Sequence, residues 1–267
     1  MSGRRFNRLR LIQKQINERP RLREWLTRLR HGGRDLDVVL FKRKVRINAL
    51  RENGYYRASQ LAHANSLLRD ETLVMQRVSM MLGDGVTFVD IGANIGIFSA
   101  VIADAQRLFR NFRVVAFEAD PATFARLAVN AERFGFDAVN IALAAEAGEL
   151  DFATGAASGI ATRRDHAGRA HIAGRGFTVA ARRLDSFDLP GRLVIKIDVE
   201  NMELDVLEGA RGLFEAKRVA AVYLDEFDDK EAVLDFLSGY GFDLKAPGRL
   251  NPFAPGRRAL FAVRREA

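Results

Sequence analysis

From Thr87 onward, short apolar stretches alternate with longer segments of helical periodicity, and this alternation limits the possible folds more than any other feature. The stretches are apolar almost throughout, which is typical of parallel strands covered by helices on both faces. The expected strands are 87–91, 113–118, 138–142, 193–198 and 220–227, and the expected helices cover about 95–106, 121–134, 202–215 and 229–239. No helical pattern follows, so the last two short strands should pair antiparallel at one edge. The pattern predicts a doubly wound, mostly parallel α/β sheet with an antiparallel last strand.

Two further segments precede this α/β domain, which we expect to span residues 86–267. Residues 1–34 are predicted to form a basic helical arm, and residues 35–85 a hairpin and a helix that lead into the core. The hairpin, in DVVLFKRKVRIN, should turn near Lys42 and Arg43. The helix is expected over 66–82, and its inner side should carry Leu67, Val74, Val78 and Met81.

The charge of the chain is concentrated in its first segment. The net charge is +8, but residues 1–57 hold 17 Lys/Arg against 5 Asp/Glu, and the remainder holds 25 against 29. The apolar residues of the predicted basic helix over 4–31, which Pro20 breaks or kinks, are Leu9, Ile12, Ile16, Leu22, Trp25, Leu26 and Leu29. Such a helix can lie on an anionic membrane, contact nucleic acid or bind a partner. We favour packing on its own domain or on a second subunit.

Composition excludes several classes of protein. The chain has no cysteine, which rules out disulfides and cysteine-ligated metal sites. No apolar run reaches the roughly 20 residues that a membrane-spanning helix needs, and the N-terminus lacks the apolar region of a secretory signal. We therefore expect a cytoplasmic protein, with peripheral attachment at the inner membrane surface as an alternative.

One low-complexity segment, residues 153–176, is rich in Gly, Ala and Arg. A long loop inside a compact domain is usually functional or disordered. Its basic side chains, Arg163, Arg164, His166, Arg169, His171 and Arg175, would suit an acidic substrate, but they would equally keep a flexible loop solvated. We slightly favour the second interpretation.

The stretch TFVDIGANIGIFSA runs from a strand through a tight glycine turn into a helix. It lacks the glycine spacing of a dinucleotide site and the Lys-Ser/Thr of a phosphate-binding loop. Asp90, just inside the strand end, would repel a pyrophosphate and attract an ammonium group. Glu118, at the end of the next strand, is placed to accept the hydroxyls of a ribose. Together these features indicate S-adenosylmethionine as the ligand.

A second polar group follows the fourth strand, in VIKIDVENMELDVLEGA. Lys196, Asp198 and Glu200 alternate with apolar residues and so share one face of a strand end, where open α/β sheets bind ligands. We predict catalytic roles for this row, and weigh against them a structural Lys196–carboxylate ion pair. Glu203 and Glu226 join the candidates for acceptor binding. Asp198, Glu200 and Glu226 could hold a divalent cation, but we favour a site without metal.

The blocks FVDIGANIGIFS, VVAFEADPATFARLAVN, LDSF and IKIDVENMELDVLEGA resemble those of FkbM-type methyltransferases, over about residues 86–227. The resemblance implies a Rossmann-like class I methyltransferase fold and O-methylation of a sugar, a glycan or another small hydroxylated metabolite. The resemblance implies that the methionine part of S-adenosylmethionine is surrounded by Asp90, Gly92, Ala93, Asn94 and Gly96. It places Glu118 at the ribose, Ala142 and Leu143 at the adenine, and Asp198 facing the methyl group.

Two other functions stay open beside this one. The basic arm allows an RNA-modifying methyltransferase, although no RNA-binding module is recognisable. The third possible function is that of a protein that docks on a membrane or on a partner and retains only cofactor binding. One departure from the family pattern is Asn201, where a glycine is usual. If the turn needs a positive φ, Asn is the best-tolerated replacement, and the Asn201 and Met202 side chains would then occupy space near the acceptor.

Overall fold

The structure is a computed structural model that describes residues 19–60, 66–154, 161–163, 176–199, 201–225, 230–245 and 259–265. Within these ranges, no helix is long and apolar enough to cross a membrane.

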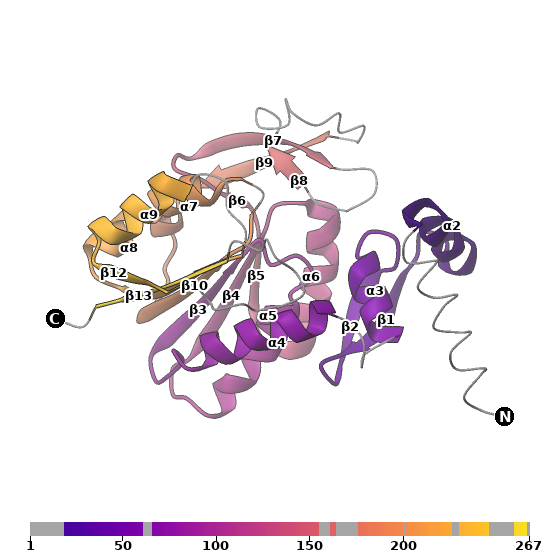
Figure 1. Ribbon diagram of the computed structural model, residues 1–267, viewed down its shortest axis with the longest axis horizontal. Helices are drawn as coiled ribbons and strands as arrows, with labels where there is room; N and C mark the ends of the chain where they lie inside the picture. The colour runs from indigo at the N-terminus through magenta and orange to yellow at the C-terminus, as the bar shows by residue number, and fades with distance from the viewer. Residues whose placement is uncertain are drawn as a thin grey trace.

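A seven-stranded sheet forms the centre of the molecule (Figure 1). Its strands, in spatial order, are β12 (Phe242–Lys245), β13 (Leu260–Arg264), β11 (Val219–Leu224), β10 (Arg192–Ile197), β3 (Val86–Ile91), β4 (Arg113–Glu118) and β5 (Asp137–Asn140). Pairing is parallel from β11 to β5, and β13 runs antiparallel to both of its neighbours. The predicted α/β sheet with an antiparallel last strand is confirmed. All six residues of β3 and of β11 are buried. They are mainly apolar, as is typical of central parallel strands, and β3 also buries Thr87 and Asp90.

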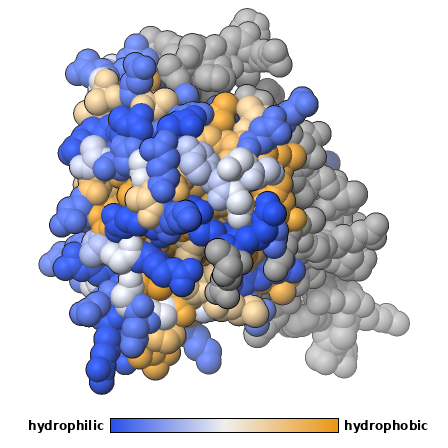
Figure 2. Space-filling model, turned by 90° about the vertical axis from the view of Figure 1, so that its left-hand side faces the viewer, coloured by the Kyte–Doolittle hydropathy of each residue, from blue (hydrophilic) through white to orange (hydrophobic). Residues whose placement is uncertain are grey.

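Helices cover both faces of this sheet (Figure 1). One face packs against α4 (Ser66–Ser79), α5 (Ile97–Ile102) with the 3₁₀ helix η1 (Ala103–Arg107), and α6 (Pro121–Phe134). The other packs against η3 (Leu184–Ser186), α7 (Glu203–Glu208), α8 (Arg211–Glu215) and α9 (Lys230–Gly239). The single helix expected over 202–215 is therefore two short helices. Among the described residues on the side that carries α8 and α9, hydrophilic and hydrophobic side chains are interspersed (Figure 2).

The segment before the sheet packs onto the first face. It contains α2 (Pro20–His31), the hairpin β1 (Asp35–Leu40) and β2 (Arg43–Asn48), and α3 (Asn53–Gln60), which the sequence pattern did not predict. The hairpin is confirmed, and its turn residues Phe41 and Lys42 both have positive φ. Residues 4–18 of the predicted basic helix lie outside the described residues, and α2 begins at Pro20.

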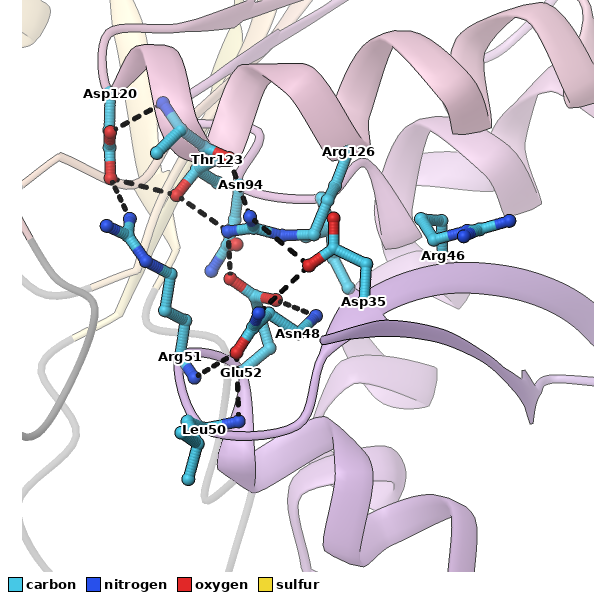
Figure 3. A network of polar contacts seen from close by, with 12 residues as sticks. Asp35, Arg46, Asn48, Leu50, Arg51, Glu52, Asn94, Asp120, Thr123 and Arg126 are labelled. Carbon is cyan, nitrogen blue, oxygen red and sulfur yellow. Dashed lines mark hydrogen bonds and ion pairs between the residues drawn. The ribbon is translucent and has the colours of Figure 1, made fainter. Parts of the chain in front are cut away.

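A polar network joins the hairpin to the start of α6 (Figure 3). Arg126 donates to Glu52 at 2.6 Å, and both side chains are buried. Beside this pair, Arg51 donates to Asp120 at 2.9 Å, and Asp120 accepts from the backbone of Ala122 as the N-cap of α6. The network fixes the chain immediately after Glu118, at the end of β4.

A second, smaller sheet corrects the prediction of one long loop over 153–176. It consists of β6 (Ala142–Leu143), β9 (Gly176–Arg182), β7 (Gly148–Thr154) and β8 (Ala161–Arg163), in that spatial order. Strands β7 and β9 pair along their length, and Phe152 stacks on Phe177. Residues 155–160 and 164–175, with most of the arginines and histidines considered above, lie outside the described residues. The small sheet packs against Ala119 and Met202, which follow β4 and β10.

Candidate active site

The ends of the central parallel strands meet at one edge of the sheet, and backbone hydrogen bonds connect the segments that leave them. The N–H of Gly92, after β3, donates to the carbonyl of Phe117 in β4 at 3.0 Å. The N–H of Asp198, after β10, donates to the carbonyl of Ile91 at 3.0 Å. The fold thereby brings the glycine turn, Glu118 and Asp198 together, as the positions of the strand ends predicted.

The turn after β3 needs residues that tolerate a positive φ. Gly92, Asn94 and Gly96 have φ of 70°, 53° and 77°, in the left-handed region. At Gly92 space is also restricted, because a Cβ there would lie 2.0 Å from the carbonyl oxygen of Asp198. Ala93 is buried within the turn, and Gly96 is the N-cap of α5. The predicted tight turn is confirmed, and its backbone passes directly against the segment that carries Asp198.

Glu118 is half-buried at the end of β4, and its carboxylate holds the turn in place. One oxygen accepts the N–H of Asn94 and the other accepts the N–H of Asp120, both at 2.9 Å. Burial raises the pKa of Glu118 to about 7, although the two N–H donors act in the opposite direction. Each oxygen keeps a further lone pair, so the ionised group can also accept hydroxyl hydrogens from a ligand.

Lys196 is the centre of a buried ion-pair cluster. Its Nζ lies 3.2 Å from Asp90 Oδ1 and 3.2 Å from Asp198 Oδ2. Asp90 is fully buried and accepts a hydrogen bond from Ser99 Oγ at 2.8 Å, whereas the Asp198 side chain is 49% exposed. Burial by itself would lower the pKa of Lys196, but the charges of Asp198, Asp90 and Asp225 outweigh it and raise that pKa. The structural ion pair that the sequence suggested as an alternative is thus present, and Lys196 has two carboxylate partners in it.

Sequence reasoning missed a buried carboxyl group beside this cluster. Glu71, on α4, accepts a hydrogen bond from Tyr55 at 2.6 Å, and its Oε2 is buried with no hydrogen-bond partner among the described residues. Burial raises the pKa of Glu71 to about 7, while the Tyr55 hydrogen bond and the charge of Lys196 lower it and Asp198 raises it. A signal was available in the sequence, because Glu71 interrupts the apolar stripe of Leu67, Val74 and Val78.

The remaining predicted residues follow β10 and β5. Asn201 has a φ of 60°, as expected if this turn needs a positive value. Met202 is buried in an apolar cluster that also contains Ala142, and Leu143 is buried against the second face of the main sheet. Glu203, the first residue of α7, is buried as well. Glu200 and Glu226 lie outside the described residues, so their catalytic roles stay predictions.

The described site is rich in carboxylates and suits a cationic ligand that carries hydroxyl groups. Asp90, Glu118, Asp198 and Asp225 lie at the strand ends, with Lys196 as the cation among them. Such a site opposes a phosphate and favours an ammonium or sulfonium group. Within the described ranges, no three acidic or histidine side chains are grouped so that they could hold a metal ion. Glu200 and Glu226, two of the three residues considered as possible cation ligands, lie outside these ranges.

The chain is similar in sequence to known methyltransferases. The model of the Methyltransferase FkbM domain matches residues 90–244, more than half of the chain. The hexuronic acid methyltransferase AglP of Haloferax volcanii is 28% identical over 152 residues, which are 56% of this chain and 60% of that protein. The chain therefore spans less than two thirds of that relative.

Solved structures with a similar fold include methyltransferase FkbM from Methylobacillus flagellatus, at 18% identity and a TM-score of 0.45, covering 68% of this chain and 44% of that one. A TehB-like SAM-dependent methyltransferase from Corynebacterium glutamicum has 15% identity and a TM-score of 0.40, with 80% and 97% covered.

Proposed function

We propose that this chain, which belongs to the FkbM methyltransferase family, transfers a methyl group from S-adenosylmethionine to a hydroxyl group of a sugar acid or a related metabolite. The observation that carries the proposal is the Glu118 carboxylate. It is fixed by two backbone N–H groups beside a tight glycine turn, and it retains lone pairs for the two ribose hydroxyls.

The residues of this edge fit the cofactor. A ligand with a sulfonium and an ammonium group is attracted by the surplus of carboxylates. Because Gly92 has no side chain, the turn can lie directly against the Asp198 segment, and the two segments together form the proposed methionine part of the site. Ala93, Asn94 and Gly96 would complete that part of the site, and the family resemblance assigns Ala142 and Leu143 to the adenine. S-adenosylmethionine supplies an electrophilic methyl group on a good leaving group.

The chain's own contribution to transfer is positioning and removal of a proton. Lys196 holds the Asp198 carboxylate at the strand end, where its half-exposed side chain can accept the proton of an acceptor hydroxyl. Asp90 pairs with Lys196 and itself accepts a hydrogen bond from Ser99. We therefore propose that Asp90 positions Lys196 and does not bind the ammonium group of the cofactor directly. Glu200, Glu203 and Glu226 are proposed to contribute to acceptor binding.

A hexuronic acid offers both hydroxyl groups and a carboxylate as methyl acceptors. The Haloferax relative is a hexuronic acid methyltransferase, and we extend this class of substrate to the present chain as a proposal. The carboxylates of Asp198 and Asp225 would repel a second carboxylate at the reacting position, so a hydroxyl is the favoured acceptor.

Calorimetric titration with S-adenosylmethionine is expected to show binding with a stoichiometry near one. Glu118→Gln should weaken it by about tenfold to hundredfold, because the ribose loses an ionised hydrogen-bond acceptor. The assignment of Glu118 to the ribose would be contradicted if the folded wild-type protein did not bind the cofactor, or if Glu118→Gln bound it equally well.

The pH dependence of the same titration provides a control. Because the pKa of Glu118 is about 7, the ionised acceptor is lost as the pH falls through that value. Affinity should therefore decrease from pH 8 to pH 6, by up to about tenfold per pH unit below 7. Glu118→Gln should remove most of this dependence, since Gln does not titrate in this range.

Transfer itself can be tested with methyl-labelled cofactor and glycosides of glucuronic and galacturonic acid, with glucosides as neutral comparison. We expect a labelled ether that survives mild alkali, whereas an alkali-labile ester would contradict the hydroxyl assignment. Asp198→Asn should slow transfer by about 100-fold or more and leave cofactor affinity nearly unchanged. Equal rates for Asp198→Asn and wild type would exclude Asp198 as proton acceptor.

A further inference from the structure

Helix α2 exposes an apolar stripe while its other side is attached to the body of the molecule. Leu22, Trp25 and Leu29 are 37%, 57% and 72% exposed, and their spacing of three and four residues places them on one face. We call these three residues the Trp25 stripe. On the attached side, Thr27 is buried and accepts a hydrogen bond from Asn53, and His31 lies 2.7 Å from the hydroxyl of Tyr56.

The surroundings of the Trp25 stripe are basic. Arg28 and Arg30 are exposed on the same helix, and the acidic residue of α2, Glu24, is paired with Arg28. The described residues 19–57, which include the neighbouring hairpin, hold 12 Lys/Arg against 4 Asp/Glu. Figure 1 shows α2 at the end of the molecule far from α8 and α9. The surface there combines apolar side chains with positive charge.

From this combination we infer that α2 docks on the surface of a membrane that contains anionic phospholipids. A lipid surface offers an apolar layer for Trp25 and Leu29 directly beneath negatively charged headgroups for the arginines. A nucleic acid offers the negative charge but leaves the aliphatic side chains uncovered. A second copy of the chain offers apolar surface but brings the same positive charge. Of these three surfaces, the lipid surface alone complements both properties.

Trp25 is the one tryptophan of the chain, so the tryptophan fluorescence of the full-length protein reports on the stripe alone. Vesicles of phosphatidylcholine with 30% phosphatidylglycerol are expected to shift the emission to shorter wavelength and to co-sediment the protein. Pure phosphatidylcholine vesicles should bind at least about tenfold more weakly, and added salt should reduce binding to the mixed vesicles.

Matched variants separate the stripe from general surface hydrophobicity. Leu29→Ser should weaken binding to the mixed vesicles at least about tenfold, because the variant lacks a leucine side chain that the lipid layer would otherwise bury. Leu108→Ser, at a side chain that is 78% exposed outside α2, should leave it unchanged. Arg28→Gln with Arg30→Gln should weaken it by about fivefold or more for each charge.

Several results would overturn the inference. These are a wavelength shift that appears with protein concentration alone, an emission maximum that is already short without vesicles, and lipid binding that Leu29→Ser does not change. None of them depends on methyl transfer, so the inference stands or fails independently of the proposed function.

Discussion

Replacing Gly92 by alanine is expected to abolish S-adenosylmethionine binding and to lower the free energy of unfolding by about 3 kcal/mol or more. Two effects add at this position. A φ of 70° is unfavourable for a residue with a Cβ, and the added Cβ would lie 2.0 Å from the carbonyl oxygen of Asp198. Because the opposing atom belongs to the backbone, no change of rotamer relieves the contact. The turn and the Asp198 segment must move apart, which displaces both sides of the proposed cofactor site.

Gly135→Ala is the matched control for this prediction. Gly135 ends α6 with a φ of 74°, close to the value at Gly92, but no atom lies within 4 Å of its added Cβ. This variant carries the cost of the left-handed conformation without a collision, so it should lose only about 1–2 kcal/mol and keep cofactor affinity. Chemical denaturation and calorimetry of both variants provide the comparison. Equal losses of stability and affinity in the two variants would mean that the positive φ, and not the close approach to Asp198, makes glycine necessary at position 92.

Lys196→Met should lower the free energy of unfolding by about 3–5 kcal/mol at pH 7. The methionine fills a similar volume, but Asp90 then remains fully buried without its cation. Within the described part of the chain, Ser99 is the side chain that still donates a hydrogen bond to Asp90. Asp198 loses the same partner at lower cost, because its half-exposed side chain can be solvated. Urea denaturation of the wild type and the variant measures the difference.

Second substitutions in the Lys196→Met background test this asymmetry. Asp90→Asn removes the uncompensated buried charge and should restore a large part of the lost stability. Asp198→Asn should restore little, because water already compensates that carboxylate. A full recovery with Asp198→Asn, or none with Asp90→Asn, would contradict the distribution of burial described above.

The sequence was most informative where local signals agree with packing. Strand β4 and helix α6 have the predicted bounds, because Asp120 caps the helix, Pro121 begins it and Gly135 ends it. The glycine turn, Glu118 and the pairing of Lys196 with Asp198 could likewise be anticipated, since strand ends in a parallel sheet converge at one edge.

Features that depend on distant parts of the chain could not be anticipated. Strands β7 and β9 pair across a low-complexity interval, and their individual sequences carry no strong strand pattern. The division between α7 and α8 arises where the chain passes close to the segment after β6, which helical periodicity does not reveal. Glu71 was visible as a carboxyl in an apolar stripe, but its nearness to Lys196 depends on how α4 packs on the sheet.

The order of strands at the far edge has a consequence for synthesis. Strand β12 leaves the ribosome before β13, yet its hydrogen-bonding neighbour in the sheet is β13, which also pairs with β11. Until Leu260–Arg264 has emerged, β11 presents an open, apolar edge and β12 has no place in the sheet. An exposed edge of this kind is a template for pairing with other chains. Strand β13 thus protects the nascent protein against aggregation, and a ribosome that stalls shortly before this strand would leave the β11 edge open.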